Sequence, residues 1–164
     1  MENKRIIDTL KTRFGGGLLE VNENSDLLTF TVSRSTIHDF IKYLKEDGSL
    51  QFDFLTDLTG VHYPDHELPL GVVYHMHSFR QNIRIRIKTF VPLDDPSVKT
   101  VTDLFSAANW MERETYDFYG ILFEGHPNLK RILNVEYLDY FPMRKEYPLE
   151  DSTREDKDDR YFGR

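Results

Sequence analysis

The 164-residue chain has 28 acidic and 21 basic side chains and a formal net charge of −7, which argues against binding to a nucleic-acid backbone. It contains no cysteine, which excludes a cysteine-ligated iron–sulfur cluster, a thiolate zinc site, a disulfide and a cysteine nucleophile. No run approaches the roughly 20 apolar residues of a membrane span, and the start lacks a secretory signal's apolar core. We therefore expect one principal domain, soluble or peripheral to a membrane, made in a bacterial cytoplasm or encoded in a plastid.

The first third of the chain alternates between helical and strand patterns. Residues 2–13 predict a short amphipathic helix that ends at the glycines 15–17. The apolar runs 18–21 and 27–32 lie on either side of a turn-like stretch and predict a hairpin. A second helix should begin after Ser35 or Thr36 and end near Asp47, and its apolar face comprises Ile37, Phe40, Ile41 and Leu44.

Three strands are expected in the middle of the chain. Residues 51–64 predict a strand, straight or bent, and 70–79 and 82–92 are rich in β-branched and aromatic residues that predict a second hairpin. Within 82–92 apolar and basic residues alternate. The residues expected to face the core are Ile83, Ile85 and Ile87. Those expected on the other face, toward water or an acidic partner, are Arg84, Arg86 and Lys88.

A helix over about 110–119 should follow. Asn109 and Glu112 have the spacing of a capping box, and Gly120 is placed to end the helix. This helix opens the least ordinary stretch of the sequence, ERETYDFYGILFEGHPNLKRIL, at 112–133.

Charges in that stretch admit three interpretations. Arg113 and Asp117 lie four residues apart and can form an ion pair on a solvated helix. Glu112, Arg113 and Glu114 point about 100° apart on a helix, so at least one charge should be directed at something other than solvent, such as a contact surface. An acid–base site would need a second convergent carboxylate, and none can be placed.

The histidines offer an alternative of another class. His75 and His77 share one face of a predicted strand, and His62 and His66 lie four residues apart near a turn. Two histidines with a carboxylate would make a metal site, which leaves a stand-alone metal-dependent enzyme as an alternative. No HExxH pairing on a helix supports it.

The chain after Pro142 is mostly charged and contains too little apolar sequence to fold alone. It is either a disordered end or an arm ordered by a partner. The second interpretation rests on apolar and aromatic side chains set among charges of both signs, namely Tyr140, Phe141, Met143, Tyr147, Leu149, Tyr161 and Phe162.

The 112–133 stretch closely resembles the signature of the 30 kDa, or C, subunit of respiratory complex I, the proton-pumping NADH:quinone oxidoreductase. FLTDLTGVHYP, VVYHMHSF, IRIRIKTFVP and FPMRKEYPLEDSTREDKDDRYFGR also resemble family segments. Met143 and Glu146 stand where the family more usually has Leu and Asp, and the first 49 residues add only their helix-and-strand pattern.

The resemblance implies an α+β fold with a mixed sheet, a domain over 1–141 and an extended arm over 142–164. It implies a non-catalytic scaffold of the peripheral arm that holds no cofactor, with FMN and iron–sulfur clusters in partner subunits. Its main partner would be the large D-type subunit that forms much of the quinone cavity, on the cytoplasmic face of the bacterial inner membrane. An equivalent subunit of a ferredoxin-linked or hydrogenase-type complex is the near alternative.

No catalytic, cofactor-binding or metal-binding residue is expected in this chain. The subunit-interface candidates that the resemblance suggests are Glu112, Arg113, Glu114, Asp117, His126, Arg131, Arg144, Lys145, Tyr147, Arg154, Arg160, Tyr161 and Phe162.

Overall fold

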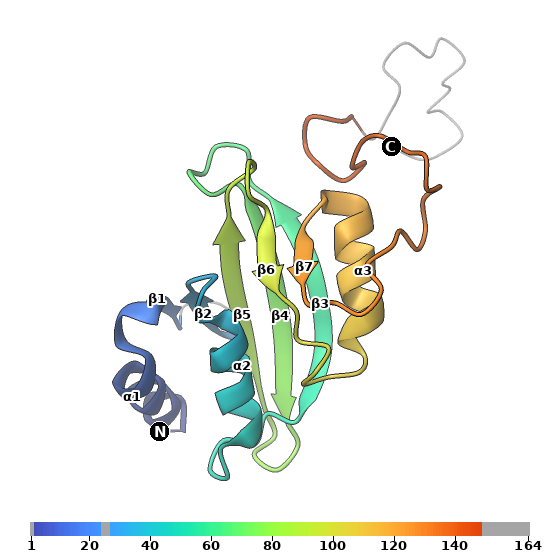
Figure 1. Cartoon of the computed structure of the whole chain (residues 1–164). Helices are drawn as coiled ribbons and strands as arrows, with labels where there is room; N and C mark the ends of the chain where they lie inside the picture. The colour runs from blue at the N-terminus through green and yellow to red at the C-terminus, as the bar shows by residue number, and fades with distance from the viewer. Residues whose placement is uncertain (1, 24–26, 149–164) are drawn as a thin grey trace, which may run out of the picture.

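The computed structural model describes residues 2–23 and 27–148. A five-stranded sheet in the order β1-β2-β5-β4-β3 forms its centre, and a two-stranded sheet pairs β6 with β7 (Figure 1). The elements in chain order are α1 (Glu2–Phe14), a 3-10 turn (Gly15–Gly17), β1 (Leu18–Asn22), β2 (Leu28–Val32), α2 (Ile37–Glu46), β3 (Phe54–His62), β4 (Leu70–Ser78), β5 (Ile83–Val91), β6 (Ser97–Lys99), α3 (Ala108–Tyr119) and β7 (Leu122–Glu124).

Both predicted hairpins are confirmed. β1 pairs with β2, and β4 pairs with β5 along nine residues of each strand, all antiparallel. β2 then runs parallel to β5, which makes the sheet mixed and confirms the predicted α+β class. A parallel pair needs a crossover, and the chain between β2 and β5 supplies one that contains α2, β3 and β4.

One face of the sheet packs into the core. Ile85 and Ile87 of β5 are fully buried, as the alternation predicted, and α1, α2, β6, β7 and α3 add side chains to the same apolar cluster. The predicted apolar face of α2 is confirmed, since its four residues are buried. Arg84, Arg86 and Lys88 alternate with the buried positions and point to the opposite face.

The start of α3 differs from the prediction. The helix begins at Ala108, and Ala107 at its N-cap makes no side-chain capping bond, so the predicted capping box between Asn109 and Glu112 is wrong. Glu112 turns inward instead. The end of the helix is confirmed, because Gly120 adopts the left-handed φ of 74° that lets its amide bond the carbonyl of Tyr116.

The strands β6 and β7 were not predicted. Each has three residues, and the two are parallel, so neither shows an alternation long enough to recognise. No helix in the described part of the chain is long and apolar enough to cross a membrane.

Candidate subunit interface

Helix α3 lies along the edge of the main sheet formed by β3 (Figure 1). The approach is close because Gly60 of β3 has no side chain: a Cβ there would stand 2.3 Å from Cδ2 of Tyr119. The glycine therefore lets the Tyr119 ring pack directly against β3. The helix also positions the long connection that follows β7.

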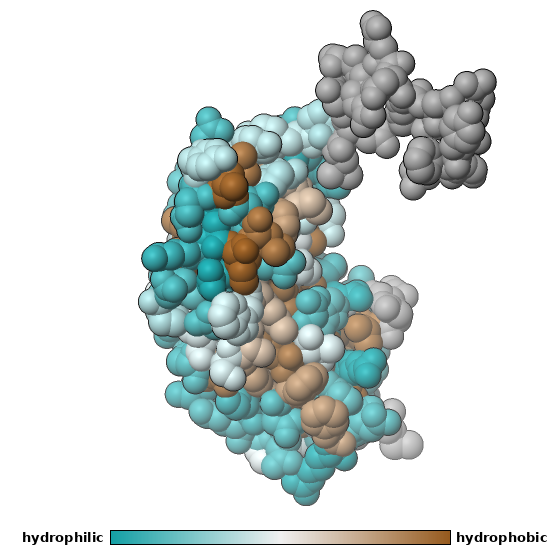
Figure 2. Space-filling view, turned by 90° about the vertical axis from the view of Figure 1, so that its right-hand side faces the viewer, coloured by the Kyte–Doolittle hydropathy of each residue, from teal (hydrophilic) through white to brown (hydrophobic). Residues whose placement is uncertain are grey.

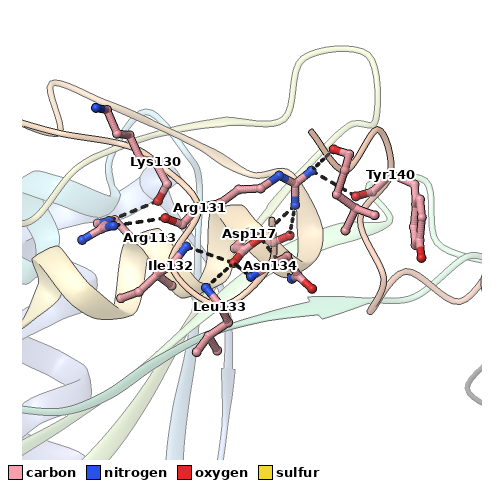
Figure 3. Close-up of polar contacts among 9 residues, drawn as sticks. Arg113, Asp117, Lys130, Arg131, Ile132, Leu133, Asn134 and Tyr140 are labelled. Atoms are coloured by element: carbon pink, nitrogen blue, oxygen red, sulfur yellow. Dashed lines mark hydrogen bonds and ion pairs between the residues drawn. The ribbon is translucent and has the colours of Figure 1, made fainter. Parts of the chain in front are cut away.

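Asp117 and Arg131 fix that connection to the helix. Asp117 is fully buried, and its Oδ1 accepts a 2.8 Å bond from Arg131 Nη1, whose side chain is 7% exposed. Asp117 Oδ2 accepts bonds of 2.8–3.0 Å from three successive amides, those of Ile132, Leu133 and Asn134. Figure 3 shows these donors converging on the one carboxylate.

The donors decide the charge state of Asp117. Burial alone raises the pKa of this carboxyl, but the amides of Asn134 and Leu133, the Arg131 guanidinium and the Ile132 amide outweigh it. The net result is a pKa held well below its usual range. Asp117 is therefore ionised inside the fold and stabilises the loop as an anion.

Arg131 and Arg113 bond to backbone carbonyls of the connection. Arg131 Nη2 donates to the carbonyls of Leu138 (2.7 Å) and Tyr140 (3.1 Å). Arg113 donates to those of Lys130 and Arg131, each at 3.1 Å, as Figure 3 shows. The expected ion pair between Arg113 and Asp117 does not form. Asp117 pairs with Arg131 instead, and Arg113 bonds to backbone carbonyls of the connection.

His126 ties the start of the connection to the start of α3. Its Nε2 lies 3.1 Å from the carbonyl oxygen of Asn109, and its Nδ1 accepts the amide of Asn128 at 3.0 Å. This pair of contacts fits the neutral imidazole with its proton on Nε2. The segment GHP is therefore a turn whose histidine bonds on both sides.

The pKa of Glu112 is shifted in the opposite direction to that of Asp117. Glu112 is fully buried, with Oε1 accepting the amide of Val101 at 2.8 Å and Oε2 the hydroxyl of Thr100 at 2.5 Å. Burial raises its pKa, the two donors lower it and the charge of Asp103 raises it, and the net result is a pKa of about 7. Glu114, two residues on, is exposed.

The first residues of the predicted arm contact the domain. Arg144 Nε donates to the carbonyl of Tyr119 at 2.8 Å, and its guanidinium lies 4.7 Å from the ring centre of Phe141. The amide of Lys145 donates to Nδ1 of the buried His62 at 2.9 Å. Up to Pro148, then, the segment follows the surface of α3 and the end of β3.

Several candidates are exposed or lie outside the described residues. The side chains of Lys145 and Tyr147 are exposed, and Tyr147 packs on Tyr140 with ring centres 4.9 Å apart. Four candidates fall beyond the described residues: Arg154, Arg160, Tyr161 and Phe162. The interface role of all thirteen stays a prediction.

Three exposed apolar side chains, Leu133, Val135 and Tyr137, were not predicted from the sequence, whereas Tyr140, Met143 and Tyr147 were among the anchors expected in the arm. Six large side chains within one short segment are exposed, with Tyr137 the most at 86%. We call these residues the apolar rim: Leu133, Val135, Tyr137, Tyr140, Met143 and Tyr147. Figure 2, which views the side that carries α3, shows apolar patches set among hydrophilic surface. Repeated apolar residues after a histidine turn were the available signal.

The histidines of the metal-site alternative make separate contacts. His62 bonds Lys145, His66 stacks on Tyr63, and His77 packs on Phe79. His75 lies between Asp57 at 3.4 Å and Arg86 at 2.9 Å. Within residues 2–23 and 27–148, no group of three or more histidine, aspartate or glutamate side chains is placed to hold a metal ion.

Comparison with known proteins agrees with the resemblance of the motifs. Residues 30–153 match the family described as "Respiratory-chain NADH dehydrogenase, 30 Kd subunit". The chain belongs to this family. It is 41% identical over 155 residues to the C subunit of the NADH-quinone oxidoreductase of Geobacter sulfurreducens, covering 94% of both chains. It is 44% identical over 138 residues to the second C-type subunit of the same enzyme from Rhizobium meliloti, covering 83% of this chain and 74% of the relative.

Two solved structures are similar to this chain in fold. One is described as "Nqo5 of the trypsin-resistant fragment (1-134)"; it is 32% identical, with a TM-score of 0.67, and the match covers 79% of this chain and all of that one. The other is a chain of the membrane-bound sulfane sulfur reductase, described as an archaeal respiratory membrane complex. It is 25% identical, with a TM-score of 0.75, and the match covers 91% of this chain and 87% of that one.

Proposed function

We propose that this chain is a non-catalytic scaffold subunit in the peripheral arm of a proton-pumping NADH:quinone oxidoreductase. The observation that carries the proposal is the 41% identity to a C-type subunit of such an enzyme over 94% of both chains. The chain would support electron transfer from NADH to a quinone, either ubiquinone or menaquinone, that other subunits carry out. FMN and iron–sulfur clusters would belong to those subunits, and the chain would lie on the cytoplasmic face of the inner membrane.

The apolar rim is the surface we assign to the large D-type partner. Tyr137 and Leu133 are 86% and 65% exposed. Contact of this apolar surface with water is unfavourable, and a partner that covered it would remove that contact. Aromatic side chains, tyrosine among them, are enriched among the interface residues that contribute most to binding. The neighbouring exposed Lys145 and Tyr147 extend the same surface along the first residues of the arm.

The buried candidates would act on this interface indirectly. Glu112 and Asp117 are fully buried, so neither carboxylate reaches the surface of the folded chain. Instead, Asp117 accepts the amide of Leu133, and Arg131 donates to the carbonyl of Tyr140, so the two side chains fix the backbone of these exposed residues. Their role toward a partner is to fix the shape of the apolar rim before contact, which lowers the ordering cost of binding.

Residues 142–164 would form an arm that becomes ordered on the assembly. The solved relative described as a trypsin-resistant fragment supports a compact domain that ends before such an arm. The contacts of Arg144 and Lys145 indicate where the arm would leave the domain. Amide exchange in the isolated chain and in the complex tests this, because equal protection of residues 145–164 in both would contradict it.

A second candidate keeps the scaffold role and changes the parent complex. The match to a chain of a membrane-bound sulfane sulfur reductase extends over 91% of this chain, so the fold also serves a respiratory complex that is named for another reaction. The electron donor would be bound by other chains in either case. The identity of the co-purified donor module therefore separates the two candidates.

Affinity purification of the tagged full chain from its own cells, followed by mass spectrometry, tests the proposed function. We expect a D-type subunit, cluster-binding subunits and a flavin-containing NADH module. Recovery of the chain alone, with stoichiometric metal and a soluble activity, would contradict the scaffold role.

Arg144→Ala, or a chain that ends at Tyr147, should lower the yield of complex without changing the redox centres of the complex that forms.

A further inference from the structure

Glu112 is a buried carboxyl that no cation among the described residues pairs with. Its two oxygens accept bonds from one amide, that of Val101, and one hydroxyl, that of Thr100. Its side chain is fully buried. Taking a carboxylate out of water without a counter-ion disfavours the charged form, so this position favours a bound proton.

A line of hydroxyl groups leads from this carboxyl toward solvent. Thr100 Oγ1 lies 2.5 Å from Glu112 Oε2 and 2.9 Å from Thr102 Oγ1, and either threonine can be the donor in the second contact. Thr100 is buried, whereas Thr102 is only half-buried. A proton leaves the carboxyl when each group in the line passes its own proton to the next oxygen, which reverses the direction of every bond, and rotation of the two hydroxyls then restores the line.

The charged neighbour that acts on Glu112 is Asp103, whose negative charge disfavours the ionised carboxyl. Tyr74 of β4 is fully buried, the negative charge of Glu112 helps to raise its pKa, and its hydroxyl has no hydrogen-bond partner within the described residues. The titratable and charged groups around this region are Tyr74, Asp103 in the connection from β6 to α3, His38 paired with Asp103, Lys99 near Asp103, and Lys45 bonded to the carbonyl of Leu104.

We propose that Glu112 is a proton-binding site that exchanges its proton with solvent through the hydroxyls of Thr100 and Thr102. In the protonated state Glu112 Oε2 donates to Thr100 Oγ1, and Thr100 donates to Thr102. In the ionised state Thr100 donates back to the carboxylate and the proton has left by way of Thr102. This inference does not depend on the proposed function.

The site is coupled to the folded shape of α3. The carboxyl of α3 holds the amide of Val101, directly after β6, so the proton lies at the contact between the helix and the small sheet. Its pKa of about 7, against an ordinary value of 4.5, means that the folded chain binds the proton more tightly than the unfolded chain. The contribution of Glu112 to stability therefore falls as pH rises from about 4.5 to about 7, and it does not change further above that pH. The fall corresponds to a change of roughly 300-fold in the unfolding equilibrium constant.

Carbon NMR of the full chain with labelled glutamate carboxyls tests the site. We expect one carboxyl resonance that titrates near pH 7 and is absent in Glu112→Gln. Glu114→Gln is the matched control, since it removes one charge from the exposed side of the same helix and should leave that resonance in place. A Glu112 resonance that titrates near the ordinary 4.5 would overturn the proposal.

Two threonine variants test the hydroxyl path. They also assign the buried carboxyl resonance to Glu112 if Glu112→Gln does not fold. Thr100→Val removes a donor to the ionised form, so the midpoint of the buried resonance should rise. Thr102→Val leaves both bonds of Glu112 in place, so the midpoint should stay while proton exchange slows several-fold. Unchanged exchange in Thr102→Val, or an unchanged midpoint in Thr100→Val, would contradict the hydroxyl path.

Discussion

Glu112 and Asp117 both lie on α3 and are both fully buried, yet the fold treats them in opposite ways. Asp117 receives three amides and a guanidinium, and its pKa falls. Glu112 receives one amide and one hydroxyl, and its pKa rises to about 7. Burial is the largest single influence on both carboxyls, and the number and charge of the donors decide whether it is outweighed.

The difference separates two structural tasks. An ionised Asp117 can order a long connection, because each oxygen accepts several bonds and the anion neutralises Arg131. A carboxyl that carries a proton near neutral pH, as Glu112 does, joins two elements with less electrostatic cost. The first builds the surface that carries the apolar rim, and the second closes the helix onto β6.

Removing Asp117 should have the largest effect. Asp117→Ala leaves the Arg131 guanidinium buried without its anion and frees three loop amides. Breaking a buried pair in this way typically costs about 3–5 kcal/mol. Urea unfolding should show a loss of that size, and the exposed Asp139→Ala should show almost none. A loss below about 1 kcal/mol would mean that the loop holds without its anion.

A double-mutant cycle measures how much of that loss belongs to the pair. Arg131→Gln removes the charge that bonds Asp117, Leu138 and Tyr140. Because the partners touch, we expect a coupling free energy of about 2–3 kcal/mol between Asp117→Asn and Arg131→Gln. Additive losses would show that Arg131 stabilises the loop only through the two carbonyls.

The pH profile should show both carboxyls with opposite signs. The folded pKa of Asp117 is depressed, so its contribution is present above its ordinary value of 3.8 and is lost as pH falls below it. Glu112 lowers stability as pH rises from about 4.5 to about 7, by up to about 3 kcal/mol. Asp117→Asn should flatten the acid limb, and Glu112→Gln the limb toward neutral pH. Limbs that persist in both variants would contradict the assignment.

The smallest expected change in unfolding free energy is at Tyr74, whose buried hydroxyl is influenced by the charge of Glu112. This hydroxyl has no hydrogen-bond partner among the described residues. Tyr74→Phe keeps the ring and removes the polar atom, so unfolding should become harder by about 1 kcal/mol. Ser78→Ala is the control, because that buried hydroxyl donates to the carbonyl of Leu50 at 2.9 Å and its loss should destabilise. A destabilised Tyr74→Phe would reveal a partner for the hydroxyl.

Much of the fold could be predicted because local patterns decide it. The alternation in β5 placed Ile85 and Ile87 in the core, and Gly120 ended α3 through its left-handed backbone. Three-residue strands such as β6 and β7 carry no such pattern, and they exist because a distant segment supplies the partner. The parallel pairing of β2 with β5 likewise depends on tertiary packing.

The site was harder to predict than the fold. The motif marked Glu112, Asp117 and Arg131 as important, but spacing along a helix suggested a capping box and an Arg113–Asp117 pair, and neither forms. Both errors have one cause. The buried carboxylates bond to backbone groups of segments 11 to 17 residues away, and helical periodicity describes only neighbours within one turn.

The most direct test of the central claim, that this chain is a scaffold whose apolar rim contacts a partner subunit, is quantitative co-purification of a rim variant. Tagged Leu133→Asp should lose most of the D-type subunit while its own unfolding free energy stays close to that of the unaltered chain. Leu19→Asp is the matched control, since Leu19 on β1 is 61% exposed against 65% for Leu133. Equal recovery of the complex with both variants would contradict the claim.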